Sequence, residues 1–88
     1  MKLVYCLDCD SVVRLTGKRE RKCECGKSGG KYLDDLNAEF FGENAVPLGF
    51  SNWSFVDAVQ NRPHEGLGER FTAFVIPTVC KTMKYVHR

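Results

Sequence analysis

Two short cysteine motifs decide how this chain folds: CLDC at residues 6–9 and CECG at residues 23–26. Thirteen residues separate Cys9 from Cys23, a length that allows an intervening β-hairpin to bring the two pairs together. Four thiolates form the tetrahedral ligand set that Zn²⁺ takes in structural sites, and such a set leaves no position open for a substrate. The sequence therefore predicts one closed, structural Zn²⁺ site with the ligands Cys6, Cys9, Cys23 and Cys25.

The second motif leaves alternatives open, because its C-x-C spacing makes a tighter turn than the more common C-x-x-C. Three other residues are candidates to replace one of the cysteines: Cys80, His64 and His87. Iron is the lesser possibility for the metal. A catalytic zinc is disfavoured, because such sites use histidine or carboxylate ligands and keep one position for water.

Size and composition indicate one small globular domain. The chain has 88 residues, of which 43% are hydrophobic, and a core of this size is near the limit of what burial alone stabilises. Neither a signal peptide nor a membrane-spanning stretch is recognisable, so we expect a cytoplasmic protein. In a reducing compartment the odd number of cysteines, five, favours metal ligands over disulfides.

Short β-prone runs flank the cysteine motifs. Strands are predicted at residues 2–5, 11–16 and 19–22. Gly17-Lys18 offers a turn between the last two, which predicts a β-hairpin between the cysteine pairs. The following GKSGGK (26–31) is predicted to be a loop whose glycines take positive φ values, with the sheet resuming at 31–33.

The second half is predicted to hold one helix and further strands. Between residues 34 and 50, Pro47 and two glycines break any long element, so we expect turns and one short strand. Ser54 is the expected N-cap of a helix over 54–62, and Pro63 ends it. The apolar run 71–76 predicts a strand buried on both faces, and 79–86 predicts another strand.

Together these features predict an α+β fold, in which an N-terminal zinc-ribbon-like β-hairpin continues into a small antiparallel sheet with one short helix. We expect a single domain over residues 1–88, with the zinc ribbon at 1–31 and the α+β remainder, 32–88, packed on it. The cysteine motifs and the basic hairpin between them resemble zinc-ribbon domains, which bind DNA, RNA or other proteins. Trp53 is expected to anchor the helix in the core.

A second resemblance covers nearly the whole chain. The segments CGKSGGKYLDDLNAEFFGENAVPLGF, NWSFVDAV and GLGERFTAFVIP resemble a group of small proteins of bacteria and their phages. The resemblance implies a standalone protein and carries over no assigned activity.

Charge is concentrated in one segment, although the net formal charge is only +2. Residues 14–31 contain seven basic and two acidic residues, a local balance of +5. Arg19 and Lys22 are candidates to contact a phosphate backbone, while a solvated hairpin tip is the plain alternative. Lys27, Ser28 and Lys31 in the glycine-rich stretch are candidates for an anion-binding nest, although the spacing does not match a phosphate-binding loop of nucleotide hydrolases.

A nucleotide pocket is a further hypothesis. Its candidate lining residues combine stacking surface with hydrogen-bond donors: Tyr32, Trp53, Arg62, His64 and Arg70. Neither Asp34 and Asp35 nor Cys80 belongs to a recognisable set of nucleophile, base and orienting group, so we expect no enzyme.

Three hypotheses for the function follow. The first is a non-enzymatic, zinc-stabilised protein that contacts nucleic acid or a host protein. The second is a phage-type counter-defence protein that sequesters a phosphate-bearing nucleotide. The third is a protein-interaction module that uses exposed Phe40, Phe41 and Phe50. The oligomeric state has no signature in the sequence.

Overall fold

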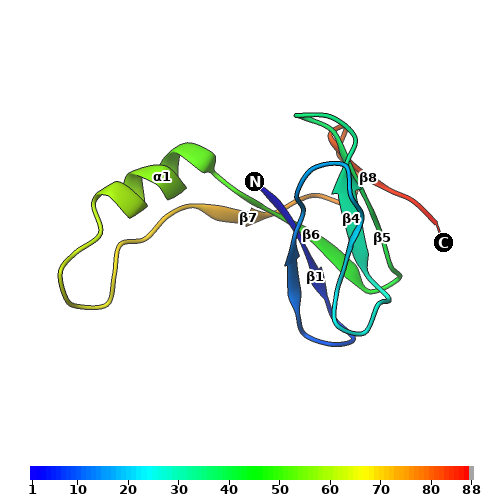
Figure 1. Cartoon of the computed structure of the whole chain (residues 1–88), viewed down its shortest axis with the longest axis horizontal. Coiled ribbons are helices and arrows are strands. Elements are labelled where there is room, and N and C mark those ends of the chain that lie inside the picture. Colours follow the sequence, from blue (N-terminus) through cyan, green and yellow to red (C-terminus); the bar gives the residue numbers. More distant parts are fainter. Residues whose placement is uncertain (88) are drawn as a thin grey trace.

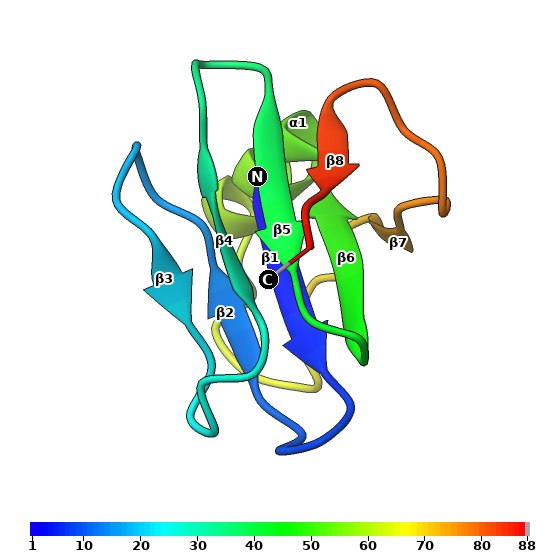
Figure 2. The same ribbon diagram turned by 90° about the vertical axis from the view of Figure 1, so that its right-hand side faces the viewer.

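The computed structural model describes residues 1–87. Eight strands form two four-stranded sheets, in the orders β2-β1-β6-β7 and β3-β4-β5-β8 (Figures 1 and 2). All strand pairs are antiparallel except β5 with β8, so the second sheet is mixed. The elements are β1 (Lys2–Cys6), β2 (Val12–Arg14), β3 (Arg21–Lys22), β4 (Gly29–Tyr32), β5 (Ala38–Phe41), β6 (Ala45–Phe50), α1 (Asn52–Gln60), β7 (Ala73–Val75) and β8 (Met83–Tyr85).

The core lies between the two sheets. Val4 of β1 and Ile76, which directly follows β7, pack with Phe40 of β5 and Met83 of β8. With one short helix beside small sheets, the predicted α+β class is confirmed. Phe40 and Phe41 are buried, so the prediction that they form an exposed interaction surface is wrong. Phe40 faces the core between the sheets, whereas Phe41, the next residue of β5, points to the opposite face, where its ring lies against Gly29 of β4.

The predicted hairpin between the cysteine pairs is wrong in its pairing. Strand β2 pairs with β1, and β3 pairs with β4, so the two expected partners belong to different sheets. The reason is that each cysteine motif itself forms the turn of a hairpin, which leaves Gly17 and Lys18 to carry the chain from one sheet to the other. Strands β2 and β3 lie side by side at one edge of both sheets (Figure 2).

The second half of the glycine-rich stretch is a strand rather than a loop. Gly26 has the expected positive φ of 78°, but Gly29 and Gly30 begin β4. Both are buried, since β4 lies between β3 and β5, which approach closely where a side chain is missing. Residues 34–50 hold two strands, β5 and β6, where one was predicted.

The helix starts two residues earlier than predicted, at Asn52, with Ser51 at the N-cap position. The hydroxyl of Ser54, the predicted cap, instead accepts a hydrogen bond from the backbone N–H of Thr72 at 2.6 Å. Trp53 is 89% exposed, so the prediction that it anchors the helix in the core is wrong. It lies on the side of α1 opposite Ala58, which is the buried residue of this helix.

Helix α1, the loop 61–72 and β7 form an arm that projects from the two sheets (Figure 1). At its base the rings of Phe50, Phe55 and Phe71 contact each other, with centroids 5.0–5.7 Å apart. The predicted strand 71–76 is confirmed only over Ala73–Val75, and its predicted burial is wrong, because these three residues are exposed. The arm raises the radius of gyration to 14.1 Å, against about 12 Å for a compact chain of this length.

Helix α1 is too short to cross a membrane, and no other helix occurs within residues 1–87.

We expect Gly30→Ala to destabilise the fold. A Cβ at this position would meet the Glu39 carbonyl oxygen and, at 3.1 Å, the Phe40 Cα of the neighbouring strand. Such overpacking costs about 1–3 kcal/mol, which in a domain of this size lowers Tm by roughly 5–20 °C. Thermal unfolding followed by circular dichroism measures this loss.

The control is Gly17→Asn. Gly17 has a φ of 61°, no atom lies within 4 Å of the place that a Cβ would take, and asparagine tolerates this backbone region. Its Tm should fall by only a few degrees. Equal losses at both positions would contradict close strand approach at Gly30.

Candidate metal centre

Two turns of the same architecture carry the four cysteines. Cys6 and Cys9 lie in the turn between β1 and β2, and Cys23 and Cys25 lie in the turn between β3 and β4. In each turn the backbone N–H of the first cysteine donates to the carbonyl oxygen of a serine five residues later. These bonds measure 2.9 Å from Cys6 to Ser11 and 2.8 Å from Cys23 to Ser28. The first sheet and the second sheet therefore each contribute one ligand turn.

The residue after the second cysteine closes each turn. The N–H groups of Asp10 and Gly26 donate to the carbonyl oxygens of Cys6 and Cys23, at 2.8 and 3.0 Å. Both residues have positive φ, 61° at Asp10 and 78° at Gly26. Glycine and aspartate are residue types that accept this region. The shorter C-x-C motif thus closes with a hydrogen bond that spans three residues, one fewer than the bond that closes C-x-x-C.

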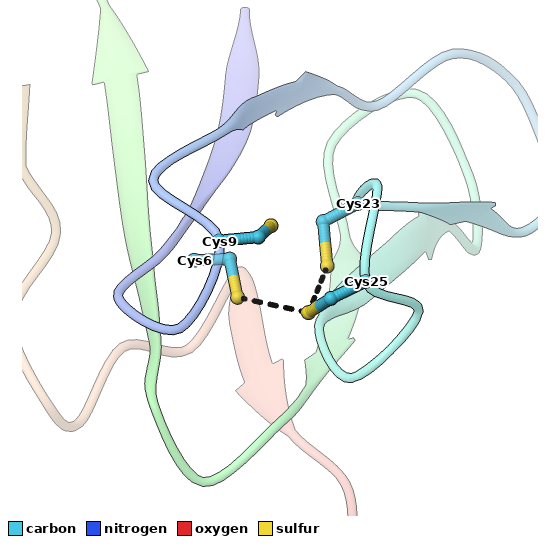
Figure 3. Close-up of side chains that lie close together, drawn as sticks. All are labelled: Cys6, Cys9, Cys23 and Cys25. Atoms are coloured by element: carbon cyan, nitrogen blue, oxygen red, sulfur yellow. Dashed lines mark hydrogen bonds between the residues drawn. The ribbon is translucent and has the colours of Figure 1, made fainter.

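The four sulfur atoms converge on one point (Figure 3). All lie within 4.8 Å of one another, with 3.7 Å between Cys6 and Cys25 and 3.5 Å between Cys23 and Cys25. A tetrahedral ion with metal–sulfur bonds of about 2.3 Å separates its sulfurs by about 3.8 Å. A disulfide needs about 2.05 Å, and all four thiols are free. The group could hold one metal ion such as zinc.

Hydrogen bonds around the sulfurs fit this interpretation. The backbone N–H of Ser28 donates to Cys23 Sγ at 3.3 Å, and the Ser11 hydroxyl lies 3.0 Å from Cys9 Sγ. The Ser28 hydroxyl is fully buried and makes no well-formed hydrogen bond, yet its proximity is the largest cause that lowers the pKa of the Cys6 thiol. A metal-bound thiolate would give this orphaned hydroxyl an acceptor.

The pKa values of the thiols are consistent with a group that could hold a cation. The Ser11 hydroxyl is the first cause that lowers the pKa of Cys9, to about 6. The Lys27 backbone amide lowers the pKa of Cys25, but burial and hydrogen bonds with the other three sulfurs outweigh it and raise the pKa to about 12. Sulfurs this close cannot all ionise unless a positive charge lies between them.

The alternative ligands lie elsewhere in the part of the chain that the structure describes. The metal-binding group found among residues 1–87 contains none of them. Cys80 packs against the core between the sheets, and its thiol lies 3.6 Å from the Thr82 hydroxyl. His64 is exposed in the arm, and the ring of His87 packs edge-on against Tyr85.

The candidate residues for anion contact separate into two environments. Arg19, Lys22 and Lys27 are exposed, on β3, the segment before it and the turn after it. Lys31 instead lies 3.7 Å from the Glu39 carboxylate, and Ser28 is buried behind the sulfurs. The structure therefore leaves the first three accessible, pairs the partly exposed Lys31 with Glu39, and buries Ser28.

The proposed nucleotide-pocket residues do not converge. The hydroxyl of Tyr32 accepts the Lys2 backbone N–H at 3.0 Å, on the core side of β4. Its ring lines a cavity of about 490 Å³ at the base of the arm. The other four lie on the exposed surface of the arm: Trp53, Arg62, His64 and Arg70. Asp34 caps the turn before Asn37, whose side chain is the first cause that lowers the pKa of Asp34 to about 2.

Ser11 and Ser28, which contact the cysteines in the two turns, were not predicted from the sequence as residues of the metal centre. Ser11 belongs to no recognised motif, and the glycine-rich stretch around Ser28 pointed only to anion binding. The available signal was that each serine follows the first cysteine of its pair by five residues. Comparison with protein-family models, with curated proteins and with solved structures finds no match to this chain.

We expect Cys6→Ser and Cys23→Ser each to lose the bound metal and to unfold at lower temperature. Loss of a structural zinc costs on the order of 5 kcal/mol or more, so Tm should fall by about 20 °C or more. Elemental analysis of protein purified without chelator gives the metal content, and calorimetry gives Tm.

Cys80→Ser is the matched control, because it removes a thiol outside the group. It should keep one metal per chain and change Tm by a few degrees at most. A parent protein without stoichiometric metal, or a Cys6→Ser variant as stable as the parent, would contradict the site.

Proposed function

We propose that this protein is a non-enzymatic, zinc-stabilised module that binds nucleic acid through a basic surface beside the metal centre. The observation that carries the proposal is a group of exposed cations over β2, β3 and the turns that join them. We define this basic surface by its six members: Arg14, Lys18, Arg19, Arg21, Lys22 and Lys27.

The basic surface is dense in charge. Residues 14–27 contain only two acidic side chains, Glu20 and Glu24, which leaves a balance of +4. Glu20 lies 3.9 Å from Lys22, and Arg21 is held by a hydrogen bond of 3.0 Å to the Thr16 hydroxyl. Exposed Lys and Arg side chains of this density bind polyanions by releasing condensed counterions from the phosphate backbone.

Aromatic surface adjoins these cations. A cavity of about 540 Å³ beside the second cysteine turn is lined by Lys22, Lys27, Tyr85 and His87, and Asp8 and Glu43 also line it. Rings next to phosphate-binding cations are the combination with which proteins hold unpaired bases. This supports single-stranded nucleic acid as the first ligand to test.

The metal centre supports a binding role rather than catalysis. Four cysteine ligands would fill a tetrahedral ion, which leaves no position to activate water or substrate. The two cysteine turns hold the ends of β2 and β3, on which the basic surface lies. We therefore assign the metal the task of fixing the shape of this surface.

We expect Arg19→Glu with Lys22→Glu to abolish binding of a fluorescently labelled single-stranded oligonucleotide, measured by anisotropy. For the parent, log K should fall with log [salt] with a slope near −0.7 per phosphate contact. The double variant should lose at least tenfold in affinity at fixed salt, because it replaces two attractive charges by two repulsive ones.

Lys81→Glu with Lys84→Glu is the matched control. It changes the net charge equally but lies outside the basic surface, at and before β8. This variant should keep most of the affinity. Equal losses of affinity in both double variants would show that only the net charge matters. The proposal would be refuted if the parent did not bind DNA or RNA in a salt-dependent way.

A further inference from the structure

Strand β7 in the arm is an edge strand without the usual protection. It pairs with β6 on one side only, and Ala73, Phe74 and Val75 are all exposed. The run FTAFVIPTV at 71–79 contains no charged residue. Natural edge strands are normally blocked by charges, proline or a covering element, because an open edge recruits another strand. Here proline occurs only after the strand has ended, at Pro77.

The hydrogen-bond pattern shows which groups remain open. Ser51 N–H donates to the Thr72 carbonyl, and Ile76 N–H donates to the Pro47 carbonyl, both at 2.9 Å. In an antiparallel ladder the bonded residues alternate, so the peptide groups of residues 72, 74 and 76 face β6. Those of Ala73 and Val75 consequently face away from the sheet.

We propose that the occupant of this edge is a second copy of the chain, whose β7 pairs antiparallel with the first across a two-fold axis. In this arrangement Ala73 of one copy bonds with Val75 of the other, and the two Phe74 rings meet between these pairs. A two-fold contact must be self-complementary, and an uncharged strand meets its own copy without repulsion.

The apolar surface of the arm has the size that such a contact needs. Exposed apolar side chains of the arm include Trp53, 89% exposed, Val75, 67% exposed, and Phe74, 49% exposed. With Val56, Val59 and Leu67 they add up to several hundred Å², since one large aromatic ring alone covers about 150–250 Å². A standard interface takes about 800 Å² from each partner, so these side chains supply much of it.

Charge permits a second copy as well. The loop 61–72 carries two arginines and two glutamates, Arg62, Arg70, Glu65 and Glu69, and α1 adds Asp57, so each arm has a net charge of only −1 and repels its copy weakly. Strand β2 lies at the opposite edge of the same sheet from β7. In a continuous eight-stranded sheet the two β2 strands are seven spacings, or about 34 Å, apart. The cations of the two basic surfaces therefore stay well beyond a Debye length.

Sedimentation equilibrium tests the proposal. The parent should show a mass of twice 10.0 kDa that falls towards one chain on dilution. Val75→Lys should be monomeric at every concentration, because it places a charge at the paired edge. Val12→Lys is the matched control: Val12 is 53% exposed, lies on the same face of the same sheet at the opposite edge, and should leave the dimer intact.

Ala73→Pro gives an independent variant. It removes an N–H that points away from β6, so the fold should remain and dimerisation should be lost. Hydrogen exchange supplies a second readout: the amides of Ala73 and Val75 should exchange slowly in the dimer and fast in Val75→Lys, and the amide of Val75 should exchange fast in Ala73→Pro. A parent that stays monomeric at millimolar concentration would overturn the proposal, even if its arm bound another protein. A Val75→Lys variant that still dimerises would also overturn it.

Discussion

Four sulfur atoms within 4.8 Å of one another are the constraint on which the rest of this structure depends. Cys6 and Cys23 are buried, so water does not screen their sulfurs, and four thiolates would repel one another there unless a cation neutralised them. The ligands come from one turn of each sheet, which makes a bound ion a cross-link between the sheets. Such an ion would add to the three places where the chain itself passes from one sheet to the other, between β2 and β3, between β5 and β6, and between β7 and β8.

This cross-link matters because the apolar core is small. Among residues 1–87 the side chains buried between the sheets centre on Val4, Leu15, Phe40 and Met83, and much of the remaining apolar surface lies on the arm. A domain of this length buries a modest fraction of its surface and usually needs a further source of stability. Metal ligation at one end of the sheets would add to the stability that side-chain packing along them supplies. The basic surface extends from the cysteine turns, at Lys22 and Lys27, along β2 and β3 to the loop of Lys18 and Arg19.

The sequence predicted the parts of the fold that local chemistry decides. Four cysteines at short spacings identify their own partners, because few other side chains bind a metal so well. The class of fold also followed, since strand and helix patterns are local. Strand pairing did not follow: β2 and β3 look like a hairpin at Gly17 and Lys18, yet each pairs across a cysteine turn instead. The two cysteine turns determine the pairing instead of the turn predicted at Gly17 and Lys18, and no local sequence pattern shows which of the competing turns forms.

The arm shows a second limit, which concerns burial. An apolar run such as residues 71–76 predicts a strand covered on both faces, and Trp53 predicts a core anchor, because apolar groups avoid water. Both predictions recognise correctly that these residues are apolar, but they are wrong about burial, because no other part of the same chain covers these side chains. Sequence composition records that a surface must be shielded, but it does not say whether the shield belongs to the same molecule. An exposed run that has the composition of an interior strand is therefore itself evidence for a contact outside the chain.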